Sequence, residues 1–233
     1  PVDAMSDCSK ALAIDPNIPE GYSNRAEAKA ALHDEQGAFD DLTKAISLHS
    51  QDPITYLSRG NILFYRREYN SAIEDFSAAI RLSPGDIDIY HNRANAYYVN
   101  GQFQEAMSDY DTVLKANPNY LESIRGKGQV FVKLEKLDDA IEMFSKIISI
   151  APKDFHAYFQ RANCYYALKR YSAALEDYNS SIAIKSDYQD ALFNRASLLA
   201  AIGRKDAAQA DYLRLLEINP NDAQVKSLLA ELH

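Results

Sequence analysis

Arginine and aspartate recur in this sequence at fixed positions, where they could pair with each other or bind anions. Within each series the spacing is 34 residues, or 68 across a single gap. The gap falls at Lys127 and Met143, where both types change together, so the two positions are coupled. Because arginine pairs with carboxylate through two hydrogen bonds, we favour partly buried ion pairs between helices over an arginine ladder that binds phosphate or carboxylate. The series are Arg25, Arg59, Arg93, Arg161 and Arg195, with Asp7, Asp41, Asp75, Asp109, Asp177 and Asp211.

The sequence contains no recognisable catalytic pattern. It lacks a glycine-rich phosphate loop and the HExxH, GxSxG and CxxC patterns. Of its five histidines, His33 and His49 are expected at turns, and His233 is the last residue. His91 and His156 are expected on helices that could face a groove, but in unrelated positions, so surface polar groups are favoured over ligands or general bases. We therefore expect no enzyme activity, no cofactor and no metal site.

The composition is that of a globular acidic protein with 47% apolar residues. Its net charge of −8 would repel nucleic acid and anionic membranes over most of the surface. No apolar run approaches the ~18–20 residues that cross a bilayer, and no charged-then-apolar leader opens the sequence. Cys8 and Cys164 match no metal or redox spacing, which fits a reducing compartment. We expect a cytoplasmic protein without nucleic-acid partners or membrane insertion.

One 34-residue period runs through the whole chain. One series of positions is always alanine, a second is always small, and a third is large in nearly every repeat. Proline closes five repeats, and serine replaces it at Ser50 and Ser186. The three series are Ala4, Ala38, Ala72, Ala106, Ala140, Ala174 and Ala208; Ala26, Gly60, Ala94, Gly128, Ala162 and Ala196; and Cys8, Leu42, Phe76, Tyr110, Phe144, Tyr178 and Tyr212.

A single repeat reads as two helices. In residues 155–188, apolar side chains recur at helical spacing before and after a break at residues 168–170. Small residues at Ala162 and Ala174 would let two antiparallel helices approach closely while Tyr178 fills the space beside them. One such hairpin cannot bury both of its apolar stripes, so it must stack on its neighbours.

The series Tyr90, Ala94, Tyr97, Ala106, Tyr110 and Pro118 resembles the tetratricopeptide repeat, and its register holds from residue 19 to residue 222. The resemblance implies an all-α, right-handed superhelical solenoid of antiparallel helix pairs. We expect six repeats, preceded by the second helix of a truncated repeat at 1–18 and followed by a capping helix at 223–233. Because the chain opens inside a repeat, we also expect protein before residue 1. The repeats are 19–52, 53–86, 87–120, 121–154, 155–188 and 189–222.

The resemblance also implies a concave groove lined by the first helix of each repeat. Amides can pair with both sides of a peptide unit, and rings supply rigid contact area, so we expect a partner polypeptide in extended form. The pattern is similar to family members that hold peptides with an asparagine ladder, although here the ladder is irregular; the alternative is hydrated surface. The expected groove residues are Asn61, Phe64, Tyr65, Asn92, Asn95, Tyr98, Arg125, Gln129, Lys133, Phe159, Asn163, Tyr166 and Asn194.

The charged groove positions refine this expectation. Arg125 and Lys133 are the only strong basic pair and could select an acidic side chain. The carboxylate clamp of co-chaperone repeat domains is set aside, because Leu57, Glu122 and Gly126 stand where the family has basic residues.

A non-enzymatic scaffold for protein–protein interaction is the function we expect. Two alternatives remain. The apolar face of residues 4–14 could mediate self-association into a homo-oligomer through an uncapped N-terminal edge. The chain could also be the substrate-selecting arm of a larger enzyme or complex.

Overall fold

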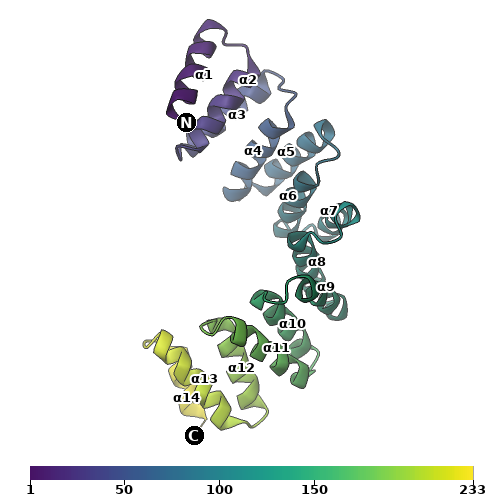
Figure 1. The fold of residues 1–233 in the computed structure, drawn as a ribbon, viewed down its shortest axis with the longest axis vertical. Helices are drawn as coiled ribbons and strands as arrows, with labels where there is room; N and C mark the ends of the chain where they lie inside the picture. Colours follow the sequence, from purple (N-terminus) through teal and green to yellow (C-terminus); the bar gives the residue numbers. More distant parts are fainter. Residues whose placement is uncertain (233) are drawn as a thin grey trace. The chain divides into compact units, whose positions relative to one another are not determined.

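The computed structural model describes residues 1–232, and every regular element in that range is a helix (Figure 1). Short turns join the helices in pairs, as at residues 31–34. The helices are α1 (Val2–Ile14), α2 (Pro19–Ala30), α3 (Glu35–Ser47), α4 (Pro53–Tyr65), α5 (Tyr69–Leu82), α6 (Ile87–Val99), α7 (Phe103–Ala116), α8 (Leu121–Lys133), α9 (Leu137–Ile150), α10 (Phe155–Ala167), α11 (Tyr171–Ile184), α12 (Gln189–Ala201), α13 (Lys205–Ile218) and α14 (Ala223–Glu231).

The chain forms two compact units, an N-terminal unit of residues 1–123 and a C-terminal unit that begins at Ile124. In the N-terminal unit α2 packs on α3, α4 on α5 and α6 on α7, and each pair also contacts the next. In the C-terminal unit α10 packs on α9 and α11, and α12 packs on α11 and α13. Each helix pair therefore buries its apolar stripes against its neighbours, which confirms an all-α fold of stacked antiparallel helix pairs.

Small residues and rings meet where the two helices of a pair touch. Ala162 and Ala174 are fully buried beside Tyr178 in the fifth repeat, as the spacing predicts. Where the ring is phenylalanine, the facing residue is glycine: a Cβ on Gly60 would lie 2.7 Å from Cε1 of Phe76. Real Cβ atoms do not approach a ring so closely, so this position needs the absence of a side chain. The sequence series of small and large residues is therefore one packing interface repeated along the chain.

The turn between the two helices of each repeat has the same backbone conformation every time. The residue two positions before the second helix adopts a positive φ, for example 58° at Lys169, inside the predicted break at residues 168–170. A left-handed residue of this kind ends a helix by satisfying its last carbonyl groups. His33 is one of these residues, and the turn placement predicted for His33 and His49 is confirmed. The set is His33, Arg67, Gly101, Glu135, Lys169 and Gly203.

The recurring arginines and aspartates form ion pairs within their helix pairs. In the third repeat, Nε of Arg93 donates to Oδ2 of Asp109 at 2.7 Å and Nη2 donates to Oδ1 at 2.8 Å. The carboxylates are buried and the arginine side chains are about one-fifth exposed. This confirms the structural interpretation, because each guanidinium already holds a carboxylate. The pairs are Arg25–Asp41, Arg59–Asp75, Arg93–Asp109, Arg161–Asp177 and Arg195–Asp211.

The last helix covers the end of the C-terminal unit. Val225 is buried, and Leu228, Leu229 and Leu232 pack against the same core cluster, which also contains Tyr212. These four residues recur at helical spacing, so they share one face. His233, the last residue of the predicted 223–233 segment, lies outside the described residues.

Three further properties of the described residues bear on function. None of the described helices is long and apolar enough to cross a membrane. In residues 1–232, no group of three or more histidine, cysteine, aspartate or glutamate side chains is arranged to hold a metal ion. Cys8 and Cys164 are free thiols, and burial raises the pKa of Cys164 to about 11. The Cys164 thiol is therefore protonated and unreactive at neutral pH.

Candidate functional site

The predicted groove residues lie on the first helix of each helix pair. We call the surface that these helices present the first-helix face: α2, α4 and α6 in the N-terminal unit, and α10, α12 and the part of α8 after residue 123 in the C-terminal unit. A cavity opens on this face in each unit, one of ≈ 960 Å³ and one of ≈ 330 Å³. Cavities lined by a few polar groups and apolar side chains are the usual places for ligand binding.

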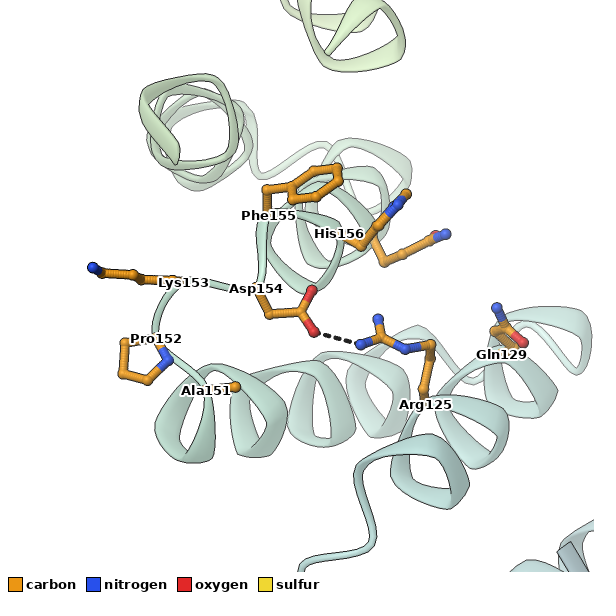
Figure 2. Close-up of a pocket in the computed structure, with 9 residues that line it drawn as sticks. Arg125, Gln129, Ala151, Pro152, Lys153, Asp154, Phe155 and His156 are labelled. Carbon is orange, nitrogen blue, oxygen red and sulfur yellow. Dashed lines mark hydrogen bonds and ion pairs between the residues drawn. The ribbon is translucent and has the colours of Figure 1, made fainter. Parts of the chain in front are cut away.

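The larger cavity lies in the C-terminal unit between α8, α10 and the loop that joins α9 to α10 (Figure 2). Gln129 of α8 and Phe155 of α10 line it, so it offers an amide and a ring to a ligand. The loop, whose backbone leaves α9 at Ile150 and enters α10 at Phe155, lines one side of the cavity. The lining residues are Arg125, Gln129, Ala151, Pro152, Lys153, Asp154, Phe155, His156 and Gln160.

Arg125 is not free to choose an acidic ligand on its own. Its guanidinium donates a hydrogen bond from Nη2 to Oδ2 of Asp154, which Figure 2 shows across the cavity. Asp154 also caps α10 by accepting a hydrogen bond from the backbone N–H of Ala157 at 2.9 Å. An acidic ligand at Arg125 would compete with Asp154, whereas Lys133 is exposed at the end of α8. The sequence did not indicate this partner, because Asp154 lies in a loop.

The smaller cavity lies in the N-terminal unit between α2, α3 and α4. Its floor is apolar and comes from Ala26, Ala38, Leu42 and Ile62. Polar side chains surround the floor, with Asn61 the only predicted groove residue among them. The polar lining residues are Ser23, Asn24, Glu27, Asp52, Thr55, Ser58 and Asn61.

The groove amides divide into two groups. In the first group the amide has a structural partner: Oδ1 of Asn95 accepts from the hydroxyl of Tyr110 at 2.6 Å. Oδ1 of Asn163 accepts from the hydroxyl of Tyr178 at 2.7 Å and from Nδ2 of Asn194 at 2.9 Å. These amides fix the interior of their repeats, and their capacity to hold a peptide backbone is reduced accordingly.

The second group consists of Asn61, Asn92 and Gln129. All three side chains are half-buried on the first-helix face, and none makes a hydrogen bond to another residue in the part of the chain that is described. A half-buried amide without a protein partner keeps its full set of donors and acceptors for a ligand. Asn95 accepts from the hydroxyl of Tyr110, whereas the repeat position of Tyr110 is held in the second repeat by Phe76, which has no hydroxyl to donate to Asn61. That difference leaves Asn61 available.

The groove rings also differ in exposure. Tyr65 is 81% exposed and Tyr166 is 46% exposed, so both can contact a partner. Phe64 and Tyr98 are half-buried. Phe159, at 9% exposure, belongs to the core, where its ring lies 6.1 Å from that of Tyr178 between centroids. Because Phe159 is buried, it packs beneath the first-helix face and offers little surface to a partner.

His91 is held in a network with the half-buried Asn95 and the buried Ser123. Nδ1 of His91 lies 2.8 Å from Oγ of Ser123, and Nδ2 of Asn95 lies 3.0 Å from Nε2 of His91. Because Oδ1 of Asn95 accepts from Tyr110, its Nδ2 faces the histidine as a donor. Nε2 must therefore accept, and the neutral ring carries its proton on Nδ1. Protonation of Nε2 would place its N–H opposite the Nδ2 donor of Asn95, and this hydrogen bond would be lost.

The free energy of unfolding is expected to fall as the pH drops below about 6.5, the ordinary histidine value, partly because of His91. Burial lowers the pKa of His91, although the nearby carboxylates of Glu122 and Asp88 act in the opposite direction. A lowered folded-state pKa means that the unfolded chain takes up the proton first, so acid favours unfolding. Urea denaturation from pH 5 to pH 8 would measure this, with His91→Phe as comparison because phenylalanine occupies the same repeat position at Phe159 and Phe193. An equal slope in both proteins would contradict the assignment.

Comparison with known proteins gives consistent matches. Sequence profiles described as TPR repeat or tetratricopeptide repeat match residues 60–101, 87–120, 125–188 and 167–232. No curated protein matches the chain. Many solved structures share its fold. The C-terminal part of a TPR repeat-containing protein from Cytophaga hutchinsonii has a TM-score of 0.80 at 20% identity, and the match covers 97% of this chain and 93% of that one.

Two other structures are similarly distant in sequence. Pseudomonas aeruginosa pilF has a TM-score of 0.72 at 16% identity, with 92% of this chain and 97% of that chain covered. YrrB, described as a TPR protein with an unusual peptide-binding site, has a TM-score of 0.71 at 22% identity, with 79% and 95% covered. At such identities the likeness shows the fold alone.

Proposed function

The chain belongs to the tetratricopeptide repeat family, and from that premise we propose that it is a non-enzymatic, cytoplasmic scaffold that binds a partner polypeptide in extended form on its first-helix face. Repeats of this family generally serve as protein-interaction scaffolds. The observation that carries the proposal is the availability of Asn61 and Asn92, two half-buried amides on this face without a partner in the described chain.

The surroundings of these amides support the same function. Tyr65 projects from the end of α4 and supplies an exposed ring, while the cavity beside Asn61 has an apolar floor. An amide that pairs with backbone and a ring that packs on side chains together suit an extended peptide. In the C-terminal unit, Gln129 and Tyr166 offer the same two kinds of contact.

Photo-crosslinking would test the proposal directly. A photoreactive phenylalanine analogue at position 65 or 166 is expected to capture peptides from a displayed random library, whereas the same analogue at exposed Leu213 on α13 is not. A captured peptide is then synthesised, and its affinity for the wild type is compared with that for Asn61→Ala/Asn92→Ala. Because each hydrogen bond contributes about 0.5–1.5 kcal/mol, the double variant is expected to bind about tenfold more weakly or worse.

The matched control is Gln104→Ala, which removes an exposed amide from the second-helix surface of α7. It should leave the affinity unchanged. Capture only at position 213, or equal affinity of the double variant and the wild type, would move the binding surface away from the first helices and reject the proposal.

Self-association is a second candidate, favoured by the exposed apolar side chains of α1. Val2 is 58% exposed and Ile14 is 88% exposed. Sedimentation over a hundredfold range of protein concentration distinguishes the candidates, since a rising mass that Ile14→Lys abolishes is expected only for self-association.

A further inference from the structure

The cavity of the N-terminal unit occupies a space that rings fill in other repeats. In the third repeat this space holds His91, Tyr98 and Tyr110: the rings of His91 and Tyr110 lie 6.0 Å apart between centroids, and Tyr98 lies close enough to contribute to the raised pKa of Tyr110. The fifth repeat fills it in the same way with Phe159, Tyr166 and Tyr178.

The first repeat has no ring at any of the three equivalent positions. They are Ser23, Ala30 and Leu42, and all three line the ≈ 330 Å³ cavity. The second helix is still in place, since Leu42 is buried and packs with Ala26 and Ala38. The cavity is therefore the space left where the repeat pattern lacks its rings.

The polar lining indicates which ring would enter. Glu27 occupies the repeat position of Asn95 and Asn163, the residues that accept the hydroxyl groups of Tyr110 and Tyr178. Asn61, half-buried and without a partner in the described chain, lines the same cavity. The hydroxyl of a phenol in this cavity would find an acceptor in Glu27, at the same repeat position as the amides that accept from Tyr110 and Tyr178.

The charge of the lining limits the choice further. Glu27 and Asp52 both carry carboxylates, and no lysine or arginine is among the lining residues. Asp52 is occupied as the cap of α4, where it accepts from the backbone N–H of Ile54 at 3.0 Å. An anionic group would be repelled, so a neutral phenol suits the cavity and its phosphate ester does not.

We propose that this cavity takes a tyrosine side chain of the polypeptide bound on the first-helix face; the inference rests on the proposed function and names one residue type of that partner. The ring packs on Ala26, Leu42 and Ile62, and the hydroxyl donates to Glu27. Ile54, 64% exposed at the mouth, contacts the peptide on either side of the tyrosine. Phosphorylation of that tyrosine releases the partner.

Titration of the ¹⁵N-labelled protein with blocked amino acids tests the cavity without any partner. N-acetyl-L-tyrosinamide is expected to shift the amide resonances of Leu42, Ser58 and Ile62 in a saturable manner, with a dissociation constant on the order of 1 mM. The phenylalanine analogue should bind several-fold more weakly, and the O-phosphotyrosine and arginine analogues at least about tenfold more weakly.

Two variants that fill the cavity should abolish these shifts. Leu42→Tyr restores the ring of the third and fifth repeats in the core. Ala30→Phe adds a ring at an exposed position where Tyr98 and Tyr166 already stand, so it tests the cavity even if Leu42→Tyr disturbs folding. Ala200→Phe makes the same change at the same repeat position in the C-terminal unit and should leave the titration unaltered.

The proposal is overturned if N-acetyl-L-tyrosinamide produces no saturable shifts, if its shifts persist in Ala30→Phe, or if the arginine analogue binds more tightly. Such a result would leave partner binding through Asn61 and Asn92 intact, because that is measured with captured peptides. Conversely, loss of capture on the first-helix face together with a positive titration would reject the proposed function while keeping the cavity's preference.

Discussion

Replacing Tyr110 with alanine is expected to lower the free energy of unfolding by about 3–5 kcal/mol, the range for deleting a buried ring. Tyr110 is 1% exposed and lies between α6 and α7, where its ring meets His91. Alanine would leave a cavity that neither helix can close, since the fully buried Ala94 and Ala106 already set their spacing. It would also leave Oδ1 of Asn95 without its donor.

Tyr110→Phe separates these two contributions. It keeps the ring and removes only the 2.6 Å hydrogen bond to Asn95, so it should cost about 1 kcal/mol. Urea denaturation followed by circular dichroism measures both variants, with Tyr65→Ala as a control because that ring is 81% exposed. Equal losses for Tyr110→Phe and Tyr110→Ala would mean that the hydroxyl, and not the packing of the ring, stabilises this repeat.

The helix pairs could be predicted because the evidence for them repeats. A small residue such as Ala162 and a ring such as Tyr178 recur at a constant separation, and only two packed helices bring such positions together in every repeat. The ion pairs could be predicted for the same reason. An arginine and an aspartate recur 16 residues apart, as at Arg161 and Asp177, and both residue types change in the same repeat. This pattern predicts that the two side chains meet.

Whether a groove side chain already has a hydrogen-bond partner was harder to predict, because the partner comes from outside the first helix. Asn61 and Asn95 hold the same repeat position, yet only Asn95 has a partner, since the residue 15 positions later is Tyr110 in one case and Phe76 in the other. That signal was present in the sequence. Arg125 gave no comparable signal, because Asp154 reaches it from an irregular loop.

The first repeat shows the converse case, where a missing residue type carries the information. Ser23, Ala30 and Leu42 are each unremarkable alone, and small residues are common in helices. Only their coincidence in space produces the ≈ 330 Å³ cavity, and only the rings of other repeats show what that space can hold. Comparing the same positions across the repeats reveals such a cavity only after the structure has shown which positions face one another.

Replacing Asp109 with methionine is expected to lower the free energy of unfolding by about 3 kcal/mol, the lower end of the range for breaking a buried ion pair. Asp109 is 5% exposed and accepts two hydrogen bonds from Arg93. Its loss leaves the guanidinium with Oγ of Ser77, at 3.0 Å, and with the faces of two tyrosine rings. The arginine side chain is 18% exposed, so water offsets part of the lost interaction.

Methionine is the informative replacement because Met143 occupies the same repeat position, so the packing tolerates it. The double variant Arg93→Met/Asp109→Met removes both charges and should cost less than Asp109→Met alone, since no charge is left buried without its partner. Asp7→Ala removes a carboxylate from the exposed Lys10–Asp7 pair and should change stability by no more than about 0.5 kcal/mol.

Hydrogen exchange of α6 and α7 should accompany urea denaturation in these variants, because a repeat array can open locally at the weakened pair before it unfolds as a whole. Faster exchange confined to α6 and α7 in Asp109→Met, with protection regained in the double variant, would show that the pair holds its two helices together. If the single and double variants lose the same stability, the two charges are not coupled. The ion-pair series would then reflect helix packing by arginine stems alone.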